Sequence, residues 1–231
     1  MKEIKMKDFI DQQLKQYADK SYLDYARQTA PEMDLLGVKV PDLKKIVTQV
    51  KRNYKLPEIL SYIREDTNIF EIETLKALLL TKMKLNEQFR IRLFAEFIPK
   101  LKTWSVCDTL CEKRRDNVED MHLWYEFCLS FIESTKDYER RFFYVFLLKH
   151  FIERENLEIL MTALEIEESN NLYVQRAAAW AVSEFAVEFR DEMLEFLKTY
   201  PNRKIARMAI MKIVESNKFT AEDKVKFKAA R

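Results

Sequence analysis

Hydrophobic residues recur at intervals of three and four along almost the whole chain, with charged residues between them. This spacing places the apolar side chains on one face of an α-helix, and it is typical of amphipathic helices that share a core. We therefore expect a succession of helices with short connections, over residues 4–28, 41–54, 56–65, 68–83, 86–101, 103–115, 119–134, 137–153, 155–166, 171–188, 190–199, 201–216 and 220–229.

The breaks between these helices coincide with residues that end or begin helices. Gly37 is suited to end one segment, and Pro41 is suited to begin the next. Asn86 offers a capping side chain, and Pro201 is expected to start the helix that follows it. No stretch resembles a flexible linker, so we expect a single domain over residues 1–231.

Glycine usage decides the fold class, because the chain holds only one glycine. Tight β-hairpins, Rossmann crevices and P-loops need glycine where φ is positive or where a phosphate comes close to the backbone. The class is therefore expected to be all-α. No run of about 18 or more apolar residues occurs, so we expect no membrane-spanning helix and no membrane partner.

The cysteines favour a reduced protein. Cys107, Cys111 and Cys128 make an odd number in a long chain, which fits a cytoplasmic location better than a disulfide framework. With His122 these cysteines span 22 residues, but a CxxxC spacing within a helix lacks the CxxC knuckles of zinc sites. We expect no metal and no cofactor.

The charge balance does not by itself indicate a nucleic-acid partner. The chain carries 40 basic and 38 acidic residues, for a net charge of +2, so DNA binding would require the basic residues to gather on one face. The alternative for each basic residue is a solvated helix edge. The candidates are Lys44, Lys45, Lys113, Arg114, Arg115, Arg176, Arg203, Lys204 and Arg207.

The number of short helices predicts stacked helix pairs, an α-solenoid. Trp104 and Arg141 are 37 residues apart, and Arg141 and Trp180 are 39 apart, close to the length of one helical-hairpin repeat. Residues one repeat apart occupy equivalent positions on neighbouring hairpins. We therefore expect these three residues, with Asp108, to line one concave surface.

Each tryptophan also has an interpretation as core packing. Trp104 precedes Asp108 by four residues, so the two share a helix face, and an unpaired carboxylate on that face is costly to bury. Trp180 follows three alanines, which is typical of a close helix contact, but Arg176 and Glu184 place charges on its face one turn away on either side.

Arg140 and Arg141 precede a run of apolar residues from 142 to 148, which predicts a central helix. Arginines at such a position either form salt bridges or bind an anion, so Arg140 joins the DNA-binding candidates. The nearby Asp137 and Glu139 favour a salt bridge for at least one of the two arginines.

Four segments of the chain together resemble the AlkD-type DNA alkylation-repair glycosylases. They are "LLGVKVPDLKKI", "LKTWSVCDTL", "YERRFFYVFLL" and "YVQRAAAWAVSEF", in the right order and at compatible spacings from about Gly37 to Lys212. The resemblance implies HEAT-like helical repeats that form a C-shaped groove around DNA. It also implies excision of cationic alkylpurines, such as 3-methyladenine and 7-methylguanine, by hydrolysis of the N-glycosidic bond without flipping the base into a pocket.

The same resemblance implies roles for individual residues. Asp108 matches the family's catalytic aspartate, and Trp104 and Trp180 match the tryptophans that cup the sugar of the damaged nucleotide. Arg141 matches the arginine that completes the site near the DNA backbone. The implied partner is double-stranded DNA carrying alkylated bases, bound by a monomer that is associated with the nucleoid when on DNA.

Two other functions remain open. A non-catalytic helical-repeat protein that recognises distorted or branched DNA would share most of these features, but it has no need for Asp108 facing phosphates. A protein-interaction solenoid unrelated to DNA would carry mixed charges on its concave face and would bury Trp104 and Trp180. Retention of all four site residues favours the glycosylase.

Overall fold

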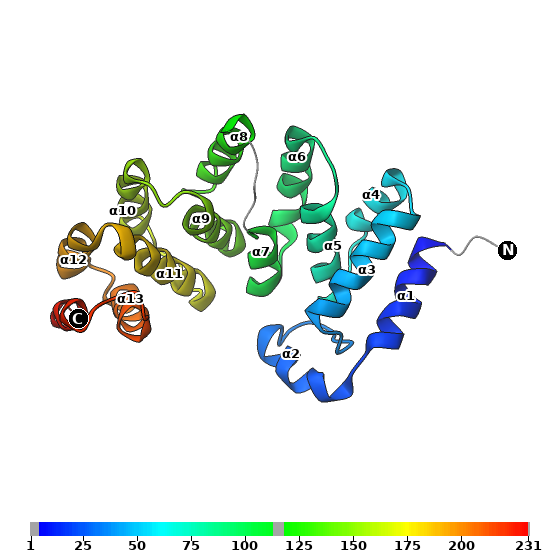
Figure 1. The fold of residues 1–231 in the computed structure, drawn as a ribbon, viewed down its shortest axis with the longest axis horizontal. Helices are drawn as coiled ribbons and strands as arrows, with labels where there is room; N and C mark the ends of the chain where they lie inside the picture. Colours follow the sequence, from blue (N-terminus) through cyan, green and yellow to red (C-terminus); the bar gives the residue numbers. More distant parts are fainter. Residues whose placement is uncertain (1–4, 113–117, 231) are drawn as a thin grey trace. The chain divides into compact units, whose positions relative to one another are not determined.

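The computed structural model describes residues 5–112 and 118–230. Over these residues the chain forms α-helices and short 3₁₀ turns, and its one β contact is an isolated parallel bridge between Asp34 and Ile69 (Figure 1). The predicted all-α class is confirmed. Among the described helices, none is long and apolar enough to cross a membrane.

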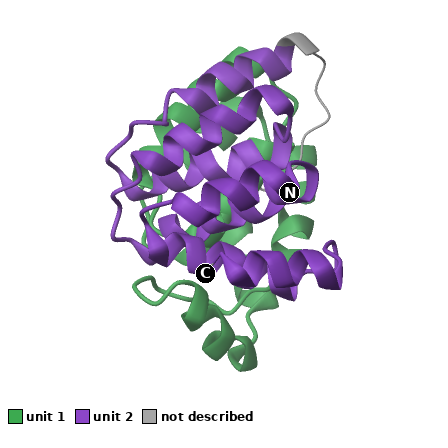
Figure 2. Cartoon of the chain, turned by 90° about the vertical axis from the view of Figure 1, so that its left-hand side faces the viewer, with its two compact units in different colours: residues 1–112 green, residues 113–231 purple. Residues whose placement is uncertain are grey.

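The chain divides into two compact units, residues 1–112 and residues 113–231 (Figure 2). Each unit is considered separately below. The expectation of one domain over the whole chain stays a prediction.

In unit 1, alternate helices pack against one another. Contacts join α1 to α3, α3 to α5 and α5 to α7, and from Thr74 to Leu80 every residue of α5 is buried. The elements are α1 (Met6–Tyr17), η1 (Lys20–Tyr22), α2 (Leu23–Thr29), α3 (Val40–Asn53), α4 (Leu56–Arg64), α5 (Phe70–Lys82), α6 (Glu87–Phe97), η2 (Ile98–Lys100) and α7 (Trp104–Leu110).

Unit 2 repeats this arrangement, with α9 packed on α11 and α11 on α13. Packing between alternate helices is the pattern that stacked helical hairpins produce. The elements are α8 (Val118–Leu129), α9 (Asp137–His150), η3 (Arg154–Asn156), α10 (Leu157–Glu165), α11 (Leu172–Glu188), α12 (Arg190–Thr199), α13 (Arg203–Glu215) and α14 (Ala221–Ala229).

Several predicted helix boundaries are wrong, among them the end of the helix expected over 119–134, which lies at Leu129. The helix expected over 4–28 is interrupted at Asp19, whose carboxylate accepts the Ser21 backbone N–H at 2.9 Å and starts a 3₁₀ turn. The helix expected over 103–115 ends at Leu110. Pro201 does not start a helix, because Asn202 caps α13 by accepting the Ile205 N–H at 3.2 Å.

The turn before α3 depends on Gly37 and on a buried carboxylate. Gly37 has φ of +79°, in the left-handed region that favours glycine. Glu71 of α5 is fully buried, and its carboxylate accepts the backbone N–H groups of Leu36 at 3.0 Å, Gly37 at 2.7 Å and Val38 at 3.3 Å. The predicted break at Gly37 is therefore confirmed, and Glu71 attaches it to the core of unit 1.

Substitution of Gly37 by alanine should destabilise the protein. A Cβ atom there would lie 2.5 Å from the carbonyl oxygen of Asp19, and the positive φ costs a side chain about 1–2 kcal/mol by itself. We expect Gly37→Ala to lower the midpoint of urea unfolding, monitored by circular dichroism. Glu32→Ala, at an exposed position of the same loop, is the matched control. Equal midpoints for the two variants would contradict the role of Gly37.

Candidate functional site

Helix α7 of unit 1 positions Trp104 and Asp108. The hydroxyl of Thr103 accepts the backbone N–H of Val106 at 3.3 Å, so the helix begins at Trp104. Val106 and Leu110 are buried on one side of this helix. Trp104 and Asp108 lie one turn apart, and both are half-buried. The shared face that their spacing predicted is therefore present in α7.

A carboxylate just after α7 ties this helix to its neighbours. Glu112 accepts a hydrogen bond of 2.5 Å from Lys82 of α5 and lies 3.4 Å from the ammonium group of Lys44 of α3. Burial raises the pKa of the Glu112 carboxyl, but Lys82 and Lys44 more than offset this, so the pKa lies below its ordinary value. Lys44, a predicted DNA contact, is thus paired with Glu112.

Unit 2 holds Arg141 and Trp180 on adjacent helices. Arg141, near the start of α9, is only 5% exposed, and its Nη1 donates to the backbone carbonyl of Tyr173 in the first turn of α11. Trp180, two turns further along α11, is half-buried and donates its Nε1–H to Glu184 at 3.2 Å. This contact agrees with the charged surroundings predicted for Trp180.

The indole ring of Trp180 also lies beneath two ammonium groups that the sequence analysis missed. The Nζ atom of Lys149, at the end of α9, is 4.8 Å from the ring centroid, and that of Lys212, in α13, is 5.9 Å from it. These distances are within the range of cation–π interactions. The available signal was the spacing of Lys149 from Arg141, eight residues along the same helix and hence on one face.

Arg140 is enclosed within unit 2 and paired with a carboxylate. It is 4% exposed, and its Nε and Nη2 atoms donate to one carboxylate oxygen of Glu167 at 3.0 and 2.7 Å. The Nη2 atom also donates to the carbonyl of Ala163 at 3.0 Å. The ion pair expected at this position exists, but its partner is Glu167 rather than Asp137 or Glu139, which accept hydrogen bonds from other residues.

Arg203 also has a structural role. Its guanidinium donates to the carbonyls of Leu197 at 2.8 Å and Tyr200 at 3.2 Å at the end of α12, and to that of Ala230 at 2.7 Å after α14. These contacts satisfy carbonyls that the helix ends leave without intrahelical partners. We therefore leave Arg203, like Arg140, out of the proposed DNA contacts.

The remaining basic candidates differ in how they are paired. Lys45 is exposed but lies 2.7 Å from Asp42. In contrast, Arg176, Lys204 and Arg207 are exposed and have no carboxylate partner among the residues that the structure describes. Lys113, Arg114 and Arg115 lie outside the described residues.

The cysteines pack in the interior. Cys107, Cys111 and Cys128 are all buried, and burial raises the pKa of the Cys128 thiol far above its ordinary value. Over residues 5–112 and 118–230, no three side chains of the types that bind metals come together. A thiol enclosed in the core is poorly placed to reach a substrate, so no cysteine joins the candidate site.

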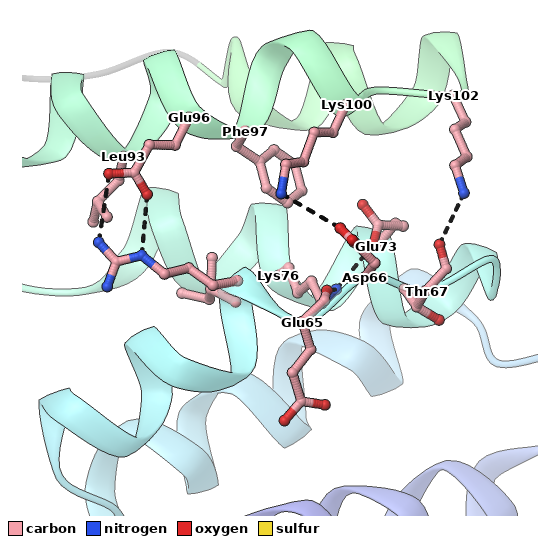
Figure 3. A pocket seen from close by; sticks show the side chains of 12 residues that line it. Glu65, Asp66, Thr67, Glu73, Lys76, Leu93, Glu96, Phe97, Lys100 and Lys102 are labelled. Atoms are coloured by element: carbon pink, nitrogen blue, oxygen red, sulfur yellow. Dashed lines mark hydrogen bonds and ion pairs between the residues drawn. The ribbon is translucent and has the colours of Figure 1, made fainter.

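A pocket of 360 Å³ in unit 1 is lined by none of the predicted site residues (Figure 3). Its charges are matched: Arg64 pairs with Glu96 at 3.0 Å, and the buried Lys76 pairs with Glu73 at 3.0 Å. The lining carries four basic and four acidic side chains, so it offers no net charge to a phosphate backbone. The lining residues are Ile63, Arg64, Glu65, Asp66, Thr67, Glu73, Lys76, Leu93, Glu96, Phe97, Lys100 and Lys102.

Each half of the predicted site is thus formed within one unit. Trp104 and Asp108 share a face of α7, while Arg141 and Trp180 lie on the packed pair α9 and α11. That the two pairs act on one nucleotide is part of the proposal that follows.

Comparison with known proteins gives one family. The family model described as "DNA alkylation repair enzyme" matches residues 10–215, which include all four of these residues. A search of curated proteins gives no match.

The buried ion pair yields a stability prediction that separates Arg140 from Arg176. Arg140→Met leaves the carboxylate of Glu167 buried without its cation, which should cost about 3–5 kcal/mol of unfolding free energy, measured in urea. The double variant Arg140→Met/Glu167→Leu should recover much of this loss, since it removes both charges. The exposed Arg176→Gln is the control and should keep the wild-type midpoint. A wild-type midpoint for Arg140→Met would show that the pair is not structural.

Proposed function

This chain belongs to the family of DNA alkylation repair enzymes, and we propose that it is a DNA glycosylase that removes cationic alkylpurines from duplex DNA. The proposed substrates are 3-methyladenine and 7-methylguanine nucleotides, and the reaction is hydrolysis of the N-glycosidic bond. The observation that carries this proposal is the half-buried carboxylate of Asp108, one helical turn from the indole of Trp104 on the same face of α7.

The chemistry suits a carboxylate that acts on the sugar. An N3- or N7-alkylated purine already carries a positive charge, so it leaves without a general acid. Positive charge then develops on the deoxyribose, where Asp108 stabilises it and orients the attacking water. At about 4 Å and an effective dielectric constant near 20, the attraction is about 4 kcal/mol, or on the order of a thousandfold in rate.

The two tryptophans fit the flanks of such a site. In the proposal, Trp104 and Trp180 contact the sugar, and each electron-rich ring adds about 0.5–2 kcal/mol of cation–π stabilisation. Both are half-buried, whereas Trp124 of α8 is fully buried and serves the core. A protein-interaction solenoid would bury Trp104 and Trp180 in the same way, so their partial exposure favours a nucleotide site.

Arg141 supplies a cation at a defined position. Its guanidinium is nearly enclosed and held by the Tyr173 carbonyl, so little side-chain entropy is lost when it binds an anion. We propose that Arg141 binds a phosphate beside the lesion. This role requires the two units to face the same nucleotide, as in a HEAT-like, C-shaped solenoid around DNA.

The backbone contacts follow from charge pairing. We propose that Arg176, Lys204 and Arg207 bind phosphates directly, because these exposed side chains have no carboxylate partner in the described part of the chain. Lys44 and Lys45 would first have to leave Glu112 and Asp42, so their contribution is smaller. Because the catalytic groups act on the sugar, the base need not enter a pocket, in contrast to most glycosylases.

Asp108→Asn tests the proposal most directly. We expect wild-type protein to release free 7-methylguanine and 3-methyladenine from methylated duplex DNA, and the variant to be slower by about a thousandfold. Asparagine keeps the shape of the side chain and removes only its charge. Asp24→Asn, which neutralises an exposed aspartate of α2, is the control and should retain full activity.

The other outcomes of this experiment identify the alternatives. Full activity of Asp108→Asn would remove the carboxylate from the mechanism. If wild type releases no base but binds DNA, and the variant binds as well or better, the protein is a non-catalytic DNA-binding member of the family. If wild type neither releases base nor binds DNA at low salt, DNA is not its substrate.

The reaction should not require a metal ion. A cationic base needs no Lewis acid to leave, and water is the only co-substrate, so base release should be unchanged after dialysis against EDTA. Base release that is lost on dialysis and restored by Mg²⁺ or Zn²⁺ would contradict the mechanism.

A further inference from the structure

The indole ring of Trp180, which is proposed to meet the sugar, is already close to two cations. Lys149 reaches the ring from α9 with its Nζ at 4.8 Å from the centroid, and Lys212 reaches it from α13 at 5.9 Å. Helix α11, which carries Trp180, packs against both of these helices. Three helices that are far apart in sequence thus bring two ammonium groups to one indole ring.

Neither ammonium group is neutralised by a carboxylate. Lys149 and Lys212 have no acidic partner within the described residues, and Glu184, the carboxylate that contacts Trp180, has other partners. One oxygen of Glu184 accepts the Trp180 Nε1–H at 3.2 Å, and the other lies 2.6 Å from Lys218. The cluster of Lys149, Lys212, Lys218 and Glu184 therefore has a net charge of +2.

The indole holds these lysines weakly. A cation–π contact at an exposed site is weaker than a charge-assisted hydrogen bond between an ammonium group and a phosphate. Lys212 is exposed and Lys149 is half-buried, and both have the long, flexible side chains that allow the charged end to move. A phosphate that approaches Trp180 would therefore draw the ammonium groups off the ring.

The proposed reaction makes this movement necessary. The same ring is proposed to stabilise positive charge on the deoxyribose, and an ammonium group left between the ring and the sugar would repel that charge. The two lysines must therefore move away from the ring when the sugar binds. The phosphates on either side of that sugar are the anions that they can then bind.

We propose that Lys149 and Lys212 are phosphate-binding residues. In the unbound protein they contact the indole ring of Trp180, and when DNA binds they move to the phosphates that flank the lesion. This inference rests on the proposed function, because it takes DNA as the ligand. It adds Lys149 and Lys212 to the residues that position the DNA. It also explains why they lie against Trp180: their ammonium groups contact the indole ring until the sugar of the substrate takes their place.

The salt dependence of DNA binding tests the inference. The probe is a duplex with a tetrahydrofuran abasic analogue, whose affinity is measured by fluorescence anisotropy over a series of salt concentrations. Each phosphate contact contributes about one unit to the slope of log K against log salt. We expect Lys149→Gln and Lys212→Gln each to reduce the slope by about one unit, and the double variant by about two.

The control is Lys226→Gln in α14. Lys226 is an exposed lysine of the same unit, paired with Glu222 at 2.7 Å, and its substitution should leave the slope unchanged. The slope also separates phosphate binding from a structural role, since a lysine that only supports Trp180 would alter affinity equally at all salt concentrations.

A second duplex identifies the phosphates concerned. Uncharged methylphosphonates replace the phosphates on either side of the abasic analogue. We expect wild type to bind this duplex more weakly than the normal one. The double variant should lose less affinity than wild type on the same change of duplex, because it already lacks the contacts of Lys149 and Lys212 and keeps only that of Arg141.

The inference and the proposed function can fail separately. If wild type binds no DNA, the proposed function fails and the inference with it. If wild type excises alkylpurines but Lys149→Gln and Lys212→Gln keep the wild-type salt slope, the glycosylase proposal stands and the inference is overturned. Equal losses of affinity on methylphosphonate DNA for wild type and double variant would also overturn it.

Discussion

The enclosure of α9 is the constraint on which much of unit 2 depends. Every residue from Glu139 to Leu148 is buried, so the helix has no exposed side along most of its length. Charged groups inside such a helix must find partners within the protein, since an unpaired buried charge is costly. Arg140 meets this demand with Glu167 beyond α10, and Arg141 with the Tyr173 carbonyl of α11. These bonds set α9 against its neighbours and leave Lys149, near its end, over Trp180.

Among the candidate DNA contacts, the pairing of charges differs between the two units. In unit 1 the candidate lysines have carboxylate partners, as Lys44 has Glu112, and the pocket beneath α6 carries equal numbers of basic and acidic groups. In unit 2 several basic side chains have no carboxylate partner among the described residues: Lys149, Arg176, Lys204, Arg207 and Lys212. Electrostatic attraction to phosphates depends on where the unpaired basic side chains lie, which the net charge of +2 does not describe.

Whether a feature could be predicted from the sequence depended on how far apart along the chain the interacting residues lie. The helix face shared by Trp104 and Asp108 and the break at Gly37 follow from spacing or backbone geometry within a few residues, and both are present in the structure. The predicted helix start at Pro201 is wrong, because the adjacent Asn202 caps α13. The internal contacts of Arg140 and Arg203 could not be predicted locally, because their acceptors, at Glu167 and Ala230, are 27 residues away along the chain in both cases.

The sequence by itself determined the all-α class, most helix positions and the residues that share a helix face, because these follow from a period of about 3.6 residues and from a near-absence of glycine. Only the tertiary structure decided which basic side chains form ion pairs within the protein and which remain available to bind a ligand. That decision depends on which helices become neighbours, and nothing in the local pattern around Lys149 or Lys212 indicates that both meet the ring of Trp180, which lies more than thirty residues from each.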